Sequence, residues 1–226
     1  MREARTRKSR YRVGKIEAGE MLATIIIGAS AALRPLPQRV LCFGDSLTAG
    51  LIGDTRDSYV PYSDTLSKAL DVESVPHGVV LESVHSMPAR LDKVLSEQQF
   101  DCAIVLGGSN DLWRGDRDAI VLSLEALYSR VRSHGALLGV VTLPPFEPSV
   151  MRWLSFTGVL EITDTTRCAV NEAIRLESRR DDAFLVDLAA FADEEVMHRP
   201  DGLHFEAAGY ARLGQRCASA IREFCS

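Results

Sequence analysis

The chain has 226 residues with 46% hydrophobic and 25% charged side chains, a composition typical of one globular domain with a substantial core. The net charge of −5 is unevenly spread, because the first 20 residues carry seven basic and three acidic side chains and the remainder is acidic. An acidic domain lacks the clustered Lys and Arg that nucleic acids and anionic membranes require, so small neutral molecules are the expected partners.

The five cysteines are scattered and odd in number, so they predict neither a disulfide framework nor a metal site. Cys42 and Cys102 fall within apolar runs and are expected to be small core residues. This cysteine usage favours a reducing compartment, and the cytoplasm is the expected location.

Residues 1–36 are predicted to be a poorly ordered basic and apolar extension outside the fold. Its apolar stretch, residues 21–33, is shorter than the roughly 20 residues that span a bilayer, so no stable membrane insertion is expected. A signal peptide and an organelle transit sequence remain alternative interpretations. Pro35 and Pro37 mark a boundary, and the domain is therefore expected over residues 37–226.

From residue 38 onward, short apolar runs alternate with amphipathic stretches. Strands are predicted at 39–43, 72–76, 100–108, 136–143 and 183–188, and helices at 62–71, 88–98, 117–133, 164–179 and 206–224. The run at 103–106 is continuously apolar, as in strands covered on both faces. This alternation predicts an α/β fold, namely a three-layer α/β/α sandwich with a five-stranded parallel sheet of the flavodoxin-like type.

Three polar clusters follow the first, third and fifth predicted strands, at residues 44–47, 107–111 and 199–204. The carboxyl ends of parallel strands share one edge of a sheet, and such sheets bind and react there. We therefore expect the three clusters to meet at one site.

Ser46 is the candidate nucleophile in the first cluster. An attacking hydroxyl needs a base to take its proton and a third group to orient that base. His204 is the candidate base and Asp201 the candidate orienting group, because both belong to one loop. Taken alone, Asp201 would be a turn residue and His204 the cap of the next helix.

Attack on an ester carbonyl places negative charge on its oxygen, so hydrogen-bond donors must surround that atom. The side chain of Asn110 is one candidate donor. The backbone N–H of Ser46 is a second, because it is expected at the start of a helix, where the helix dipole favours negative charge. Taken alone, Asn110 would be a turn or capping residue after the third strand.

Together these residues resemble the GDSL family of lipases and esterases, also called SGNH hydrolases, over about residues 38–224. The matches are Gly44, Asp45, Ser46 and Leu47 in the first motif, Gly108, Asn110 and Asp111 in a "GxND" motif, and Asp201 and His204 in a "DxxH" motif. The resemblance implies that Ser46 is the nucleophile, that Asn110 is an oxyanion donor, and that Asp201 and His204 complete a catalytic triad.

The second motif of that family, commonly "GxSGxT", supplies a further oxyanion donor from a glycine. The best register here is Gly78 to Ser83, which places Leu81 where the glycine is expected. A leucine keeps the backbone N–H but lacks the conformational freedom of glycine in φ. We expect the Leu81 N–H to be the donor, with Ser83 and Ser86 as alternatives in a shifted register.

These residues and the resemblance predict a hydrolase that cleaves small acyl or acetyl esters through an acyl-enzyme, without a cofactor or metal. The alternative is a binding module with an idle serine that recognises an acylated sugar or lipid, and Leu81 is its main support. A phosphate-binding or receiver domain is disfavoured because no Gly-rich phosphate loop is present. Trp113 and the segment 144–160 could line the substrate pocket or be structural, and the remaining histidines are expected to be surface or packing residues.

Overall fold

The computed structural model describes residues 33–52, 58–147 and 159–226, and the compact folded unit begins at Arg34. Five strands form one sheet in the order β2-β1-β3-β4-β5, with all four pairings parallel. The strands are β1 (Arg39–Gly44), β2 (Glu73–Gly78), β3 (Cys102–Leu106), β4 (Leu137–Val141) and β5 (Ala183–Val186). This order is that of flavodoxin-like folds and confirms the predicted fold class.

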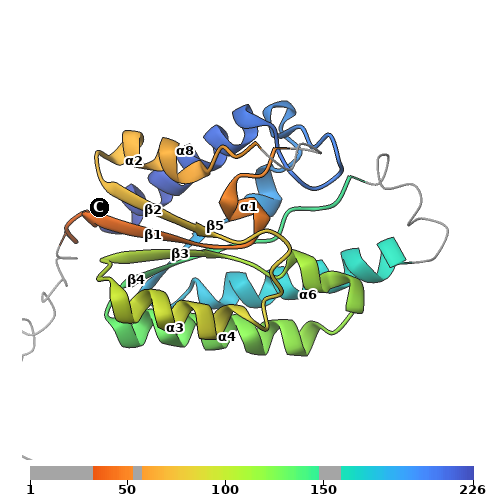
Figure 1. Ribbon diagram of the computed structural model, residues 1–226, viewed down its shortest axis with the longest axis horizontal. Helices are drawn as coiled ribbons and strands as arrows, with labels where there is room; N and C mark the ends of the chain where they lie inside the picture. Colours follow the sequence, from red (N-terminus) through yellow and green to blue (C-terminus); the bar gives the residue numbers. More distant parts are fainter. Residues whose placement is uncertain (1–32, 53–57, 148–158) are drawn as a thin grey trace, which may run out of the picture. The chain divides into compact units, whose positions relative to one another are not determined.

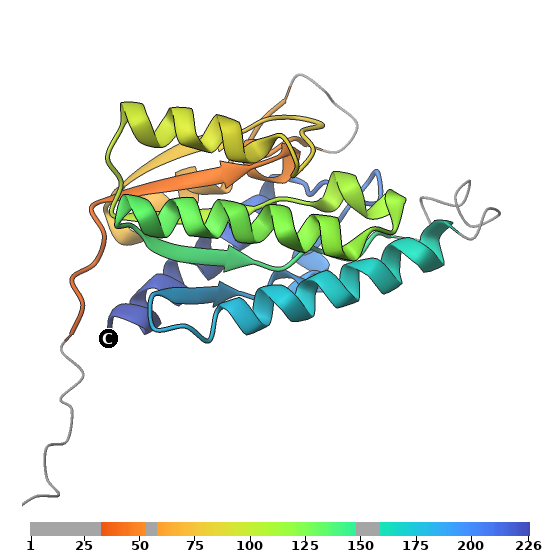
Figure 2. The same cartoon turned by 90° about the horizontal axis from the view of Figure 1, so that it is seen from below.

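Helices cover both faces of the sheet (Figures 1 and 2). On one face lie α2 (Tyr62–Leu70) and α8 (Ala207–Cys225), and on the other lie α3 (Met87–Glu97), α4 (Arg117–His134) and α6 (Val159–Glu177). Because helices cover both faces, every residue of β3 is buried, without an alternating pattern. None of the helices in the described ranges is long and apolar enough to cross a membrane.

Short helical segments follow three of the strands and define the edge where the polar clusters lie. They are α1 (Ser46–Ala49) after β1, η1 (Ser109–Arg114) after β3, and α7 (Leu188–Phe191) with η2 (Glu195–Met197) after β5. Hydrophobic periodicity does not predict elements of three to six residues, because they present no repeated apolar face.

Helix α6 begins five residues before its predicted start. Its buried side chains include Thr163, Thr166 and Asn171, which are polar and so do not contribute to a hydrophobic pattern. The Asn171 amide accepts a hydrogen bond from Leu143 N–H at 2.7 Å and donates one to Leu143 C=O at 2.9 Å. A satisfied polar residue therefore occupies a position on the buried face of the helix.

Gly44 ends β1 and allows α1 to begin immediately. It lies between Gly78 of β2 and Leu106 of β3, and a Cβ on it would stand 1.9 Å from the Leu106 carbonyl oxygen and 2.4 Å from Thr48 Oγ1. Only a glycine fits this close approach of backbones. The chain therefore turns sharply at Gly44, and Ser46 stands at the carboxyl edge of the sheet.

Candidate active site

Ser46, His204 and Asp201 form a continuous chain of hydrogen bonds. The Oγ of Ser46 lies 2.7 Å from Nε2 of His204, and Nδ1 of His204 lies 2.6 Å from Oδ2 of Asp201. Since a carboxylate can only accept, Nδ1 carries the imidazole proton and Nε2 is free to accept from the serine hydroxyl. The structure thus brings together these three predicted residues, although Ser46 and His204 are separated by 158 positions along the chain.

Asp201 is held as a carboxylate by its hydrogen bonds. Burial alone would raise its pKa, but the hydrogen bonds from the His204 ring and from the backbone N–H groups of Leu203 and His204 outweigh burial and hold the pKa below its usual value. The negative charge therefore persists next to the imidazole and favours one ring orientation.

The loop that carries Asp201 and His204 is tied to the segment that follows β4. The guanidinium of Arg199 donates to the Pro145 carbonyl and lies 3.6 Å from Glu147 and 3.5 Å from Asp193. The Glu147 N–H also donates to the carbonyl of Gly202 at 2.7 Å. Arg199 is almost fully buried and was not predicted, because the Pro145 carbonyl lies 54 residues earlier in the chain.

Asp45 precedes the serine and caps α1. Its Oδ1 accepts from the Leu47 N–H at 3.0 Å, and its Oδ2 has no partner in the described part of the chain. The side chain is fully buried, and burial raises the pKa of this carboxyl to about 7. Asp45 therefore supports the turn that presents Ser46, and its charge is sensitive to pH near neutrality.

Three groups near this edge can donate to an oxyanion. The backbone N–H groups of Ser46 and Leu81 donate no hydrogen bond within the described residues. The amide of Asn110 donates to the carbonyl of Glu82 at 3.0 Å, which uses one of its two N–H groups and leaves the other available. Because α1 has only four residues, little helix dipole supports the Ser46 N–H, contrary to our expectation.

Leu81 adopts the backbone conformation that the sequence suggested it could not easily reach. Its φ is +62°, in the left-handed region that normally favours glycine, and its side chain is 78% exposed. This conformation costs about 1–2 kcal/mol in a residue with a Cβ. The position matched to the family glycine therefore has the glycine-like backbone despite the leucine.

The hydroxyl groups of the alternative donors in this loop are engaged elsewhere. The hydroxyl of Ser83 donates to Asp111 at 2.5 Å, and that of Ser86 donates to the carbonyl of Ser83 at 2.8 Å. The second oxygen of Asp111 accepts from the N–H of Val84 at 2.8 Å. Asp111 is thus buried as an anchor for this loop, next to Asn110.

His85, which was expected to be a surface or packing residue, is partly exposed and lies near a carboxylate. Its Nδ1 lies 2.7 Å from the hydroxyl of Ser123, and its Nε2 lies 3.8 Å from Asp111. No sequence motif links these residues, which come from a loop, α4 and η1. Only the fold brings His85 near the carboxylate.

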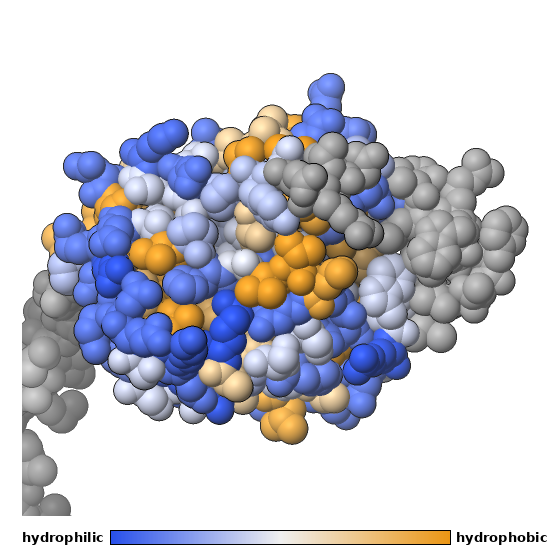
Figure 3. Space-filling view, in the orientation of Figure 1, coloured by the Kyte–Doolittle hydropathy of each residue, from blue (hydrophilic) through white to orange (hydrophobic). Residues whose placement is uncertain are grey.

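An aromatic pair borders the same edge. Trp113 of η1 contacts Phe146, which follows β4, with ring centroids 4.7 Å apart. Trp153 and Phe156, which belong to the segment 144–160 suggested above as part of the pocket, lie outside the described residues. Figure 3 shows hydrophobic side chains in several separate patches on the face drawn there, among mainly hydrophilic ones.

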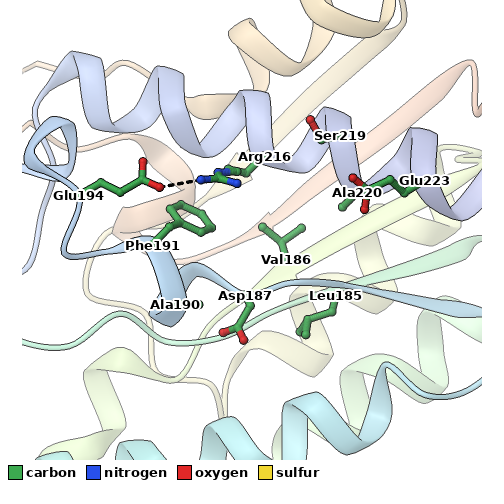
Figure 4. A pocket seen from close by; sticks show the side chains of 10 residues that line it. All are labelled: Leu185, Val186, Asp187, Ala190, Phe191, Glu194, Arg216, Ser219, Ala220 and Glu223. Carbon is green, nitrogen blue, oxygen red and sulfur yellow. Dashed lines mark hydrogen bonds and ion pairs between the residues drawn. The ribbon is translucent and has the colours of Figure 1, made fainter.

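A separate hollow of about 320 Å³ lies beside β5, between α7 and α8 (Figure 4). Arg216 lines this hollow, pairs with Glu194 at 2.6 Å and stacks on the ring of Phe191. Its lining includes none of the predicted site residues. Across the described ranges, no group of three or more His, Cys, Asp or Glu side chains is placed to hold a metal ion.

Solved structures with the same fold include several esterases. The chain is similar to the inhibitor-bound aryl esterase of M. smegmatis (21% identity, 83% of this chain and 99% of that one, TM-score 0.66). It is also similar to a catalytic mutant of an acetylxylan esterase from Geobacillus stearothermophilus (18% identity, 81% of this chain and 94% of that one, TM-score 0.62). A third similar structure is a lipase/acylhydrolase from Enterococcus faecalis (22% identity, 82% of this chain and 96% of that one, TM-score 0.59). No curated protein matches the sequence.

A flavodoxin-like sheet with a hydrogen-bonded serine and histidine at its carboxyl edge is an arrangement suited to hydrolytic enzymes that use a serine. A model of the GDSL-like lipase/acylhydrolase family matches residues 42–212. The chain therefore belongs to this family, as the sequence motifs indicated.

Proposed function

We propose that the protein hydrolyses small carboxylic esters through an acyl-enzyme formed on Ser46. The observation that carries this proposal is the chain of hydrogen bonds from Ser46 Oγ through His204 to Asp201. The family and the esterases among the similar structures support ester hydrolysis. Short acyl or acetyl groups are the proposed substrates, and the reaction uses no cofactor.

In the first half-reaction, Ser46 Oγ attacks the ester carbonyl while Nε2 of His204 takes the hydroxyl proton. The Asp201 carboxylate holds the ring and stabilises the imidazolium that forms. The carbonyl oxygen becomes an oxyanion, which accepts hydrogen bonds from the N–H of Ser46, the N–H of Leu81 and the side chain of Asn110. The C–O bond then breaks, and His204 returns the proton to the leaving alcohol.

In the second half-reaction, water replaces the alcohol. His204 takes one proton from the water as its oxygen attacks the acyl carbon, and the same donors stabilise the second oxyanion. The bond to Ser46 breaks, the proton returns to Oγ, and the carboxylic acid leaves. The sum is ester plus water giving acid plus alcohol.

Hydrolysis of p-nitrophenyl acetate and butyrate tests the proposal, together with labelling by a fluorophosphonate probe. We expect the wild type to turn over both esters and to be labelled, whereas Ser46→Ala should lose about 10³-fold or more in rate and all labelling. Ser96→Ala is the matched control, because Ser96 lies on α3 and its exposed hydroxyl donates to the carbonyl of Lys93. An unchanged rate in Ser46→Ala would overturn the proposal.

A binding module with an idle serine is the alternative. Its support was the leucine in place of glycine, and the positive φ of Leu81 weakens that support. Binding of an acetylated sugar without turnover or probe labelling would favour the alternative. A series of p-nitrophenyl esters of increasing acyl length then tests the proposed preference for short chains.

A further inference from the structure

Two residues other than glycine have positive φ in the described part of the chain, Asp71 and Leu81. Asp71 ends α2, where a left-handed residue commonly terminates a helix. Leu81 lies in the loop between β2 and α3, where no helix end accounts for its conformation. Such a conformation persists only where the surrounding structure enforces it.

Arg90 on α3 binds the carboxylate of Glu82, the residue that follows Leu81. Its Nε lies 2.9 Å and 3.0 Å from the two carboxylate oxygens of Glu82, and its Nη2 lies 2.5 Å from one of them. Both side chains are largely buried, with 22% of Arg90 and 9% of Glu82 exposed. A fork of this kind fixes direction as well as distance.

The same guanidinium also reaches the strand that ends at the nucleophile. Its Nη2 donates to the carbonyl of Gly44 at 2.9 Å, its Nη1 donates to the carbonyl of His77 at 2.9 Å, and the group lies 3.9 Å from the centre of the Phe43 ring. Gly44 is two residues before Ser46. Arg90 therefore joins the loop that carries Leu81 directly to the strand that carries the serine.

The backbone carbonyl of Glu82 and the side chain of Ser83 are held by η1, the short helix that follows β3. The amide of Asn110 donates to the Glu82 carbonyl at 3.0 Å, and Asp111 anchors the hydroxyl of Ser83 at 2.5 Å. Glu82 and Ser83, the two residues that follow Leu81, are thus tied to α3 and to η1.

We propose that Arg90 is a positioning residue for the oxyanion hole. Through Glu82 it keeps Leu81 in the left-handed conformation, so that the Leu81 N–H stays directed toward the oxyanion formed at Ser46. The proposal rests on the ester hydrolysis proposed above. Lysine cannot replace this arginine, because an ammonium is a point charge without the planar fork that reaches Glu82, His77 and Gly44 together.

The test is steady-state hydrolysis of p-nitrophenyl acetate by the full chain with Arg90→Gln and with Arg90→Lys. An oxyanion donor acts on the transition state, so both variants should lose about 10–100-fold in kcat with KM changed less than about 2-fold. Arg39→Gln is the matched control. Arg39 also pairs with a glutamate, Glu73, and stacks on a phenylalanine, Phe100, but it lies at the amino end of β1.

A second substitution separates positioning from general support of the fold. In a Leu81→Gly background the left-handed conformation needs no enforcement. The fold-loss in kcat that Arg90→Gln causes there should therefore be less than about a third of the loss it causes in the wild type. An equal fold-loss in both backgrounds, or an Arg90→Gln kcat equal to that of Arg39→Gln, would overturn the proposal.

If Arg90→Gln does not fold by circular dichroism, Glu82→Ala takes its place, because it removes the fork while Arg90 keeps its bonds to Gly44 and His77. The same kcat loss and the same relief by Leu81→Gly are expected, and their absence would contradict the proposal. Failure of the proposed function itself is recognised separately, because Ser46→Ala would then hydrolyse the ester at the wild-type rate.

Discussion

The ring tautomer of His204 follows from its hydrogen bond to Asp201. Asp201 accepts from Nδ1 at 2.6 Å and thereby leaves Nε2 unprotonated toward Ser46. An asparagine at 201 can offer an N–H to the ring, which favours the opposite tautomer. We expect Asp201→Asn to lower kcat for p-nitrophenyl acetate by about 10²–10⁴-fold, measured in a steady-state assay.

Asp193→Asn is the control for that substitution. Asp193 lies in the segment before the same loop, but its side chain is 85% exposed and pairs with Arg199. Its rate should remain within about 2-fold of the wild type. An Asp201→Asn enzyme as fast as this control would show that Asp201 does not orient the base.

Asp45 is expected to make stability depend on pH near neutrality. Its pKa is raised from an ordinary 3.8 to about 7, so between these values the unfolded chain releases a proton that the folded protein retains. The stabilisation is present in full below about pH 4 and is lost as pH rises toward 7. Asp45→Asn is always neutral and should therefore gain stability relative to the wild type at pH 8, by up to about 4 kcal/mol.

Urea unfolding of Asp45→Asn and of the wild type at pH 4.5 and pH 8 measures the difference in their free energy of unfolding. Asp201→Asn provides a comparison of opposite sign, because the pKa of Asp201 is lowered and its carboxylate stabilises the fold above the unfolded pKa. Asp201→Asn should thus lose stability to a similar extent at pH 4.5 and at pH 8, because both values lie above the ordinary Asp pKa of 3.8, whereas Asp45→Asn differs from the wild type mainly at pH 8. A pH-independent difference between Asp45→Asn and the wild type would contradict the assigned burial of the charge.

The residues of the proposed triad could be predicted from the sequence because local motifs contain them. Ser46 follows a strand directly, Asp201 and His204 share a loop, and the expected convergence of the strand ends together with the family resemblance suggested their chemistry. Arg90 and Arg199 could not be predicted, because their partners include backbone carbonyls 46 and 54 residues away that only the fold brings near. Supporting residues of this kind carry no local pattern.

At the scale of elements, the junction of β1 and α1 determines where the serine stands. A side chain at Gly44 would collide with the Leu106 carbonyl and Thr48. We expect Gly44→Ala to destabilise the protein by about 3 kcal/mol or more. The Leu106 carbonyl is part of a packed strand and the Thr48 side chain is buried, so neither can move away easily. Thermal unfolding measures the loss.

Gly135→Ala separates this steric effect from the conformational one. Gly135 ends α4 with a φ of +85°, but a Cβ there would meet no atom within 4 Å. Its substitution should cost only about 1–2 kcal/mol. Equal losses for the two variants would show that the close approach at Gly44 is not what requires the glycine.

The long elements could be predicted because their apolar patterns are set by burial. The continuous apolar run in β3 and the single stripe of α4 correspond to buried residues in the structure. The left-handed conformation of Leu81 could not be predicted, because a leucine gives no local signal for it. Loop conformations imposed by distant contacts lie beyond pattern analysis.

At the scale of the whole molecule, the sheet order concentrates the polar clusters. Strands β1 and β3 are adjacent, so Ser46 and Asn110 follow neighbouring strands. The loop after β5 returns across the end of β4, where Arg199 and Gly202 contact the segment 145–147. His204 thereby reaches Ser46 although β5 forms the far edge of the sheet.

The start of the folded unit gives a final prediction. Arg34 donates from its backbone to the Cys225 carbonyl at 3.1 Å and from its side chain to the Asp181 carbonyl at 2.6 Å, and it lies 4.6 Å from the centre of the Phe224 ring. Gln38 donates to Asp101 at 3.0 Å. Residues 34–38 are thus bonded to the body of the domain.

We therefore expect a chain that begins at Arg34 to unfold at the same temperature as the full chain and to hydrolyse p-nitrophenyl acetate at the same rate. A chain that begins at Arg39 loses the contacts of Arg34 and Gln38 and should unfold about 5 °C or more below it. Differential scanning calorimetry of the three proteins makes the comparison. Every buried core residue among the described residues lies between Val40 and Cys225, which is why the chain from Arg34 is expected to keep the full midpoint. A lower midpoint already in that chain would mean that residues 1–33 contribute to the stability of the domain.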